Sequence, residues 1–105
     1  MAPKGPILPR KSTALSRSRG SLWSIAFQVG TLVAVERNRN RMTQQELADA
    51  VGIRQIDVSG IENGQPVAKT VKDAQIDKLF LKVGLPKKSA RLQANFVKWW
   101  RDNAG

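Results

Sequence analysis

Apolar residues spaced three and four apart predict a first helix, capped by Ser21 and ending at about Asn38. The residues that this spacing brings to one face are Trp23, Ala26, Phe27, Gly30, either Val33 or Ala34, and Arg37. Glycine costs about 0.5–1 kcal/mol inside a helix, so Gly30 indicates close contact with a neighbouring helix.

Residues 42–64, MTQQELADAVGIRQIDVSGIENG, predict two short helices joined by a tight turn. Thr43 and Glu46 stand three apart, so that each side chain can accept a hydrogen bond from a free backbone N–H at a helix start. A helix is therefore expected to begin at Gln44 and to end at Gly52, which adopts the left-handed conformation readily. Its apolar side carries Leu47, Ala48 and Val51.

After the turn, Ile53 is expected to return to the core. Either Ile56 or Val58, together with Ile61, continues the apolar stripe through a second short helix. That helix ends at Asn63 and Gly64. The residues expected on its outer side are Arg54, Gln55, Asp57, Ser59 and Gly60. Two helices joined in this way form a helix-turn-helix.

Two further helices are expected after a loop of residues 65–69. Thr70 and Asp73 can start the first, which ends at Gly84, and its apolar positions are Val71, Ala74, Leu79, Phe80 and Val83. Ser89 can cap the second, in which Leu92, Phe96, Trp99 and Asn103 follow one another on one face. Trp99 and Trp100 cannot both point the same way on a helix, so one is expected to dock on the bundle and the other to be available to a partner, and Phe96, Trp99 and Trp100 are the candidates for this interface. The alternative is that both tryptophans only cover the domain's own core.

The residues Thr43-Gln44-x-Glu46-Leu47-Ala48, Val51-Gly52-Ile53, Val58 and Ile61-Glu62-Asn63-Gly64 resemble the xenobiotic-response-element (XRE) type of helix-turn-helix, the family of phage repressors and Cro proteins. The resemblance covers residues 22–86 and implies an all-α fold, a compact five-helix repressor-like bundle. It divides the chain into a disordered basic arm (1–20), a DNA-binding domain (21–86) and a C-terminal helical extension (87–105). The alternative is an ordinary helical hairpin whose glycines are only caps.

The resemblance also implies the residues of a DNA site. The residues expected to contact bases are Arg54, Gln55, Ile56 and Ser59, and Gln44 and Asn63 are expected to contact phosphates. Arg37 and Glu62 match a partly buried ion pair of the family, whereas Arg39 and Arg41 are expected to be solvated and free to contact phosphate. Asp57 and Gly60 depart from the family's usual pattern, since one places a carboxylate near a polyanion and the other removes a side chain.

Composition narrows the possible functions. The 105 residues include no cysteine and no histidine, which excludes disulfides, thiolate or imidazole metal sites and histidine-based catalysis. No catalytic, metal or cofactor site is therefore expected, and an enzyme is not predicted. The apolar stretch 25–35 is too short to span a bilayer, which needs about 20 residues. We expect a cytoplasmic, nucleoid-associated protein.

The net charge of +10 favours a polyanionic partner. Residues 1–20, 21–41 and 65–105 have net charges of +5, +2 and +6, whereas residues 42–64 have −3. Positive charge thus flanks the helix-turn-helix.

The expected function is a transcriptional regulator that binds double-stranded operator DNA as a homodimer on an inverted repeat. One alternative is a protein-interaction module, an anti-activator or antitoxin, whose aromatic C-terminal helix binds a protein partner. Another is a non-specific nucleic-acid binder driven by charge. The basic arm is expected either to lie on DNA or to act only as a solubilising leader.

Overall fold

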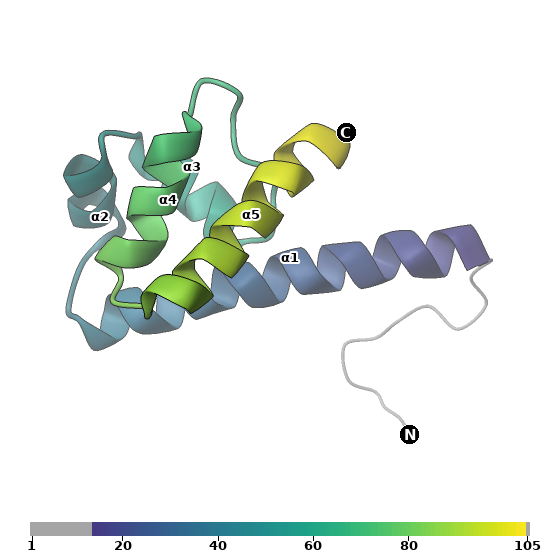
Figure 1. Ribbon diagram of the computed structural model, residues 1–105, viewed down its shortest axis with the longest axis horizontal. Helices are drawn as coiled ribbons and strands as arrows, with labels where there is room; N and C mark the ends of the chain where they lie inside the picture. Colours follow the sequence, from purple (N-terminus) through teal and green to yellow (C-terminus); the bar gives the residue numbers. More distant parts are fainter. Residues whose placement is uncertain (1–13, 105) are drawn as a thin grey trace.

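In the computed structural model, which describes the backbone of residues 14–104 and the side chains of residues 21–104, the chain is all-α (Figure 1). The helices in this part of the chain are α1 (Ala14–Arg39), α2 (Gln44–Val51), α3 (Gln55–Glu62), α4 (Asp73–Lys82) and α5 (Lys87–Asn103). Helix α1 is the long element at the bottom of Figure 1, and the other four helices pack on one side of it. The predicted all-α bundle is confirmed.

Helix α1 begins at Ala14, so the predicted start at Ser21 is wrong. The backbone of residues 14–20, assigned to the N-terminal arm from the sequence, forms the first turns of this helix. The rest of the predicted arm, residues 1–13, lies outside the described residues. At 1.5 Å per residue, the 26 residues of α1 extend over about 39 Å, well beyond the helices packed on it.

The side of α1 that faces the core is built around a close approach to α3. Ala26, Val29, Gly30, Val33 and Arg37 are buried on this side. A Cβ atom added to Gly30 would lie 2.1 Å from the carbonyl oxygen of Ile61, so only glycine permits this distance between the two helices. Phe27 was predicted to share this face of α1, and that prediction is wrong, because the residue is 56% exposed.

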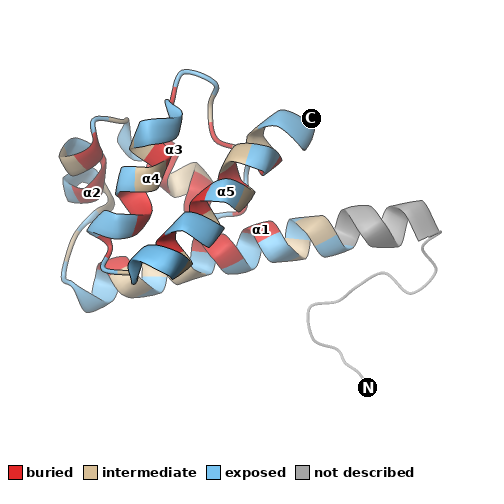
Figure 2. Cartoon of the chain, in the orientation of Figure 1, coloured by how far each residue is buried: buried red, intermediate tan, exposed pale blue. Residues whose placement is uncertain are grey.

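Side chains from all five helices and from the loop before α4 close the core (Figure 2). The largest fully buried side chains are Phe80, Leu47, Ile76, Leu79, Val33, Val58 and Val83. Of the two residues proposed for the inner face of α3, Val58 is buried, whereas Ile56 is 64% exposed. Ile53 is partly buried against the core, as predicted.

Helix α4 starts later than predicted. Its N-cap is Lys72 rather than Thr70, and the Lys72 backbone N–H donates to Oε1 of Gln75 at 2.8 Å. This shift turns the predicted core residue Ala74 to solvent and brings Ile76 to the core instead.

Helix α5 starts earlier than predicted and buries a different face. It begins at Lys87, directly after Pro86, so Ser89 lies inside the helix. Its buried residues are Ala90, Ala94, Val97 and Trp100, whereas the predicted stripe of Leu92, Trp99 and Asn103 is exposed. Among the described residues, no helix is long and apolar enough to cross a bilayer.

We expect Gly30→Ala to destabilise the protein by about 1–3 kcal/mol, since the added methyl group would force α1 and α3 apart. Gly60→Ala in α3 is the matched control, because its Cβ would meet only Gln65 at 4.0 Å. Because alanine is more favourable than glycine inside a helix, Gly60→Ala should leave the free energy of unfolding unchanged or raise it by up to about 1 kcal/mol. Urea unfolding followed by circular dichroism measures both, and equal effects would contradict the close-approach argument.

Candidate functional site

Helix α2 and the turn after it are held by local and long-range hydrogen bonds. The Glu46 N–H donates to Thr43 Oγ1 at 3.0 Å, and the Thr43 N–H donates to Glu46 Oε1 at 2.8 Å, as the capping prediction requires. Gly52 has φ 79° and its N–H donates to the Ala48 carbonyl, which ends the helix as predicted. From α4, Gln75 Nε2 donates to the Gly52 carbonyl at 2.9 Å. The turn is thereby attached to a helix outside the motif.

Helix α3 starts at an ion pair that also caps it. The Asp57 carboxylate accepts the backbone N–H of Arg54 at 3.0 Å and the guanidinium Nη2 of the same residue at 2.9 Å. The Asp57 side chain is only 5% exposed, so its predicted place on the outer side is wrong, while that of Arg54 is 65% exposed. Hydrogen bonds from Arg54 lower the pKa of Asp57, and Asp57 in turn raises the pKa of Arg54. The carboxylate that seemed unsuited to a polyanion is neutralised within the protein.

A chain of hydrogen bonds connects the first turn of α3 with the core. Gln55 Nε2 donates to Gln44 Oε1, and Gln44 Nε2 donates to Glu62 Oε1 at 2.9 Å. Arg37 binds both carboxylate oxygens of Glu62, through Nε at 2.7 Å and Nη2 at 3.1 Å. The side chain of this arginine also donates to the Met42 carbonyl at 2.7 Å. The predicted Arg37–Glu62 pair is present and buried, and its hydrogen bond raises the pKa of Arg37.

The residues predicted to contact bases gather at the exposed start of α3. Arg54 precedes the helix, Gln55 and Ile56 lie in its first turn and are exposed, and Ser59 lies one turn further on, half-buried. Beside Gly60 the surface is open, since an added Cβ would meet only one atom at 4.0 Å. This end therefore presents a guanidinium, a side-chain amide and an aliphatic group to solvent.

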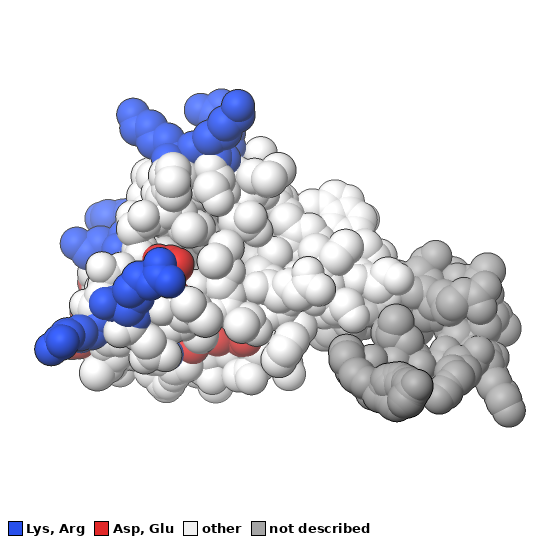
Figure 3. Space-filling model, turned by 90° about the horizontal axis from the view of Figure 1, so that it is seen from below, with Lys and Arg blue, Asp and Glu red and all other residues white. Residues whose placement is uncertain are grey.

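The residues predicted to contact phosphates are more scattered around the start of α3 than those predicted to contact bases. Gln44 is hydrogen-bonded to Gln55, but Asn63 lies at the other end of α3, where its Nδ2 donates to the Ser59 carbonyl at 2.8 Å. Arg39 closes α1 and is solvated as predicted, but its Nη1 lies 3.4 Å from Glu36 Oε2, so it is not free of a partner. Arg41 lies in the connection to α2. Figure 3 shows lysine and arginine side chains gathered at the end of the molecule opposite the grey segment and along one edge.

The aromatic residues proposed as a partner interface separate into buried and exposed members. Trp100 is 3% exposed, packs edge-on against Trp23 with ring centroids 4.7 Å apart, and donates from Nε1 to the Gly64 carbonyl at 3.1 Å. It therefore holds the end of α3 and cannot contact a partner, which corrects its inclusion in that interface. Trp99 is 44% exposed, and Phe96 is half-buried beside it.

Comparisons of the chain with protein-family models, curated proteins and solved structures found no match. Within the described residues, no cluster of acidic side chains could hold a metal ion.

We expect Asp57→Asn to lower the free energy of unfolding at pH 7 by about 0.5–2 kcal/mol, because it removes a charged cap. The pKa of Asp57 is lowered in the folded protein, so the carboxylate stabilises the fold above its unfolded pKa of about 3.9. This contribution is lost as the pH falls through the pKa that Asp57 has in the folded protein. The difference in free energy of unfolding between Asp57→Asn and the parent should therefore disappear in acid. Urea unfolding between neutral pH and acid pH tests this. Asp102→Asn, at an exposed residue of α5, is the control, and a gap independent of pH would contradict the role of Asp57.

Proposed function

We propose that this protein is a sequence-specific DNA-binding transcriptional regulator that inserts the start of α3 into the major groove. One observation carries the proposal: Gln55 and Ile56 are exposed on the first turn of a helix that is connected to the buried Arg37–Glu62 pair. In helix-turn-helix proteins the second helix lies in the major groove with its N-terminal residues on base edges. The resemblance to phage repressors supports the same assignment.

The side chains at this end suit base recognition. The Gln55 amide combines a donor and an acceptor, which matches N6 and N7 of adenine, and Ile56 suits the methyl group of thymine. Arg54 uses Nε and Nη2 to bind Asp57, which leaves Nη1 for a guanine acceptor. Gln55 and Ile56 are therefore the main candidates for specificity, and Arg54 has a capping role besides any contact with DNA.

Affinity for the phosphate backbone has separate sources. Residues 42–64 have a net charge of −3, yet Asp57 and Glu62 are both paired with arginines inside the protein. Gln44 and Asn63 offer neutral phosphate contacts, and Arg41, in the connection between α1 and α2, adds positive charge. Binding to DNA should therefore weaken as salt rises, as for any protein that displaces counterions.

A second copy of the chain is the proposed partner on DNA. Six of the eight exposed large hydrophobic residues in the described part of the chain lie on α1 and α5: Trp23, Ile25, Phe27, Val35, Leu92 and Trp99. Residues 21–35 carry no charge, and the surface over this part of α1 is white in Figure 3. Such a face allows two strongly basic molecules to meet without opposing like charges. A homodimer would present two α3 helices to an inverted repeat with half-sites about 34 Å apart.

We expect Gln55→Ala to weaken binding to the preferred duplex by about 5–150-fold, the equivalent of one lost base contact worth 1–3 kcal/mol. The DNA upstream of the protein's own gene is tested first, and the preferred duplex is then selected from a randomised pool. The affinity for this duplex is measured with random competitor present at several salt concentrations. Gln93→Ala on α5 is the control and should bind as the parent does.

Two outcomes would contradict this proposal. Equal displacement by random and selected duplexes would indicate a non-specific binder. Unchanged binding in Gln55→Ala, together with loss of a protein partner in Trp99→Ala, would favour the second candidate, a protein-interaction module. The exposed aromatic ring of Trp99 is the observation that keeps this candidate open.

We expect Trp99→Glu to shift the protein from dimer to monomer, because it places a charge on the exposed apolar face of α5. Sedimentation equilibrium over a range of concentrations measures this. Ile56→Glu, at a more exposed site on α3, should leave the oligomeric state unchanged. A parent protein that remains monomeric at every concentration would refute the homodimer.

A further inference from the structure

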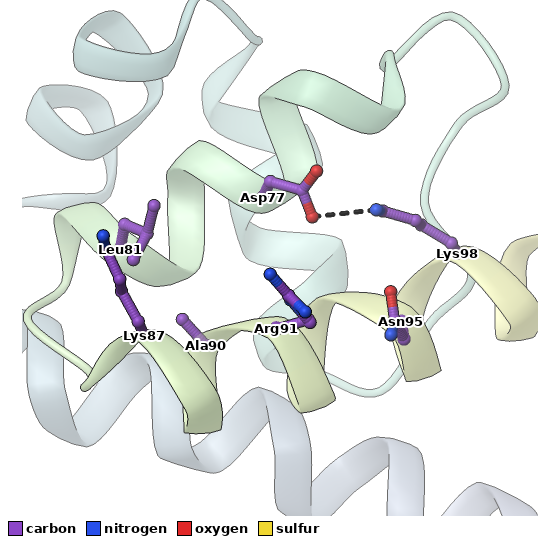
Figure 4. Close-up of a pocket in the computed structure, with 7 residues that line it drawn as sticks. All are labelled: Asp77, Leu81, Lys87, Ala90, Arg91, Asn95 and Lys98. Carbon is purple, nitrogen blue, oxygen red and sulfur yellow. Dashed lines mark ion pairs between the residues drawn. The ribbon is translucent and has the colours of Figure 1, made fainter.

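A groove of about 380 Å³ lies between α4 and α5, outside the helix-turn-helix (Figure 4). Helix α4 supplies Asp77 and Leu81, and α5 supplies Lys87, Ala90 and Arg91. In Figure 1, α4 and α5 lie nearer the viewer than α3. The groove is therefore separate from the start of α3.

The groove has a neutral end and a positively charged end. At the neutral end, Lys98 Nζ lies 2.8 Å from Asp77 Oδ1, and the two charges cancel. At the other end, Lys87 and Arg91 form no ion pair with any described residue, and together with Lys88 they line an adjoining hollow. These three cations lie within five residues of one another, and none of them forms an ion pair with a described residue.

Apolar surface lies beside these cations. Leu81 is 47% exposed, and Ala90, which is 2% exposed, lines the groove between Lys87 and Arg91. Positive charge next to an exposed aliphatic side chain matches a ligand that carries carboxylates together with an apolar side chain. We propose that the α4–α5 groove binds an acidic protein segment, with two carboxylates on Lys87 and Arg91 and an aliphatic side chain against Leu81.

The spacing of the cations defines this ligand further. Lys87 and Arg91 stand four apart on α5, which separates them by about 6 Å along the helix axis. Glutamates at positions i and i+4 of a helical segment have the same separation, and so do carboxylates two apart on an extended segment, at about 6.7 Å. An apolar residue between the acidic residues would face Leu81.

Charge argues against other occupants of the groove. Residues 1–20 have a net charge of +5, so the protein's own N-terminal segment would be repelled. The uncharged residues 21–35, which form part of the face proposed for the homodimer, offer no carboxylate to Lys87 and Arg91. The backbone of a duplex could neutralise Lys87 and Arg91, but it has no aliphatic group to cover Leu81. An acidic protein segment satisfies both features.

The test uses the full-length protein and a short fluorescent peptide that has glutamates four apart with leucine between them. We expect saturable binding by fluorescence anisotropy and about tenfold weaker binding to Arg91→Glu. Lys78→Glu, an exposed residue of α4 outside the groove, is the matched charge reversal and should bind nearly as the parent does. A second peptide with serine in place of leucine should bind more weakly than the first.

Three results would overturn the proposal: no saturable binding of the peptide, equal loss in the two charge-reversal variants, or equal affinity for the leucine and serine peptides. Duplex DNA is titrated in parallel. If Arg91→Glu weakens DNA binding more than Lys78→Glu does, the groove belongs to a nucleic-acid surface instead. The proposal does not depend on DNA recognition by α3, so Gln55→Ala should bind the peptide as the parent does.

Discussion

The buried ion pair between Arg37 and Glu62 is the interaction on which the rest of this structure depends. It joins α1 to the end of α3, directly beside the glycine that lets the two helices approach. Breaking a buried pair by removing one partner typically costs 3–5 kcal/mol, whereas a solvent-exposed pair contributes about 0–1 kcal/mol. Because Glu62 also binds Gln44, the same carboxylate fixes the polar side chains next to the start of α3. The Glu62 carboxylate therefore connects the core with the candidate site.

Acidic residues of the helix-turn-helix, residues 42–64, are neutralised by arginines within the protein. If all the acidic side chains of residues 42–64 were exposed to solvent and unpaired, their net charge of −3 would argue against contact with a polyanion. In the structure, Asp57 is bound by Arg54 and Glu62 by Arg37, so two of the four acidic residues are already compensated. Glu46 caps α2, and Asp49 accepts a hydrogen bond from Gln45. The acidic residues of the motif thus maintain helix ends and packing, and the exposed end of α3 remains polar and uncharged apart from Arg54.

Sequence signals predicted α2 and the turn after it, where the determining contacts are local. The Thr43–Glu46 cap and the left-handed Gly52 require only residues within one helix, and both were predicted correctly. Helix α3 has eight residues, too few for periodicity to distinguish Ile56 from Val58 or to show that Asp57 turns inward. Contacts between distant segments had no local signal: Gln75 with the Gly52 carbonyl, and Trp100 with the Gly64 carbonyl. The start of α4 was misplaced because Thr70–Asp73 and Lys72–Gln75 offer competing caps, and only the packing of Ile76 decides between them.

Helix α4 contacts both the helix-turn-helix and the proposed groove. Its first turn holds the α2–α3 turn through Gln75, and residues further along it, Asp77 and Leu81, line the groove. Its ten residues extend over about 15 Å, and Ile76, Leu79 and Phe80 are almost fully buried along its inner side. A helix packed in this way resists movement, because interiors are close-packed and displaced side chains lose their contacts. An acidic segment in the groove would therefore leave the start of α3 in place, so the two proposed sites could be occupied at the same time.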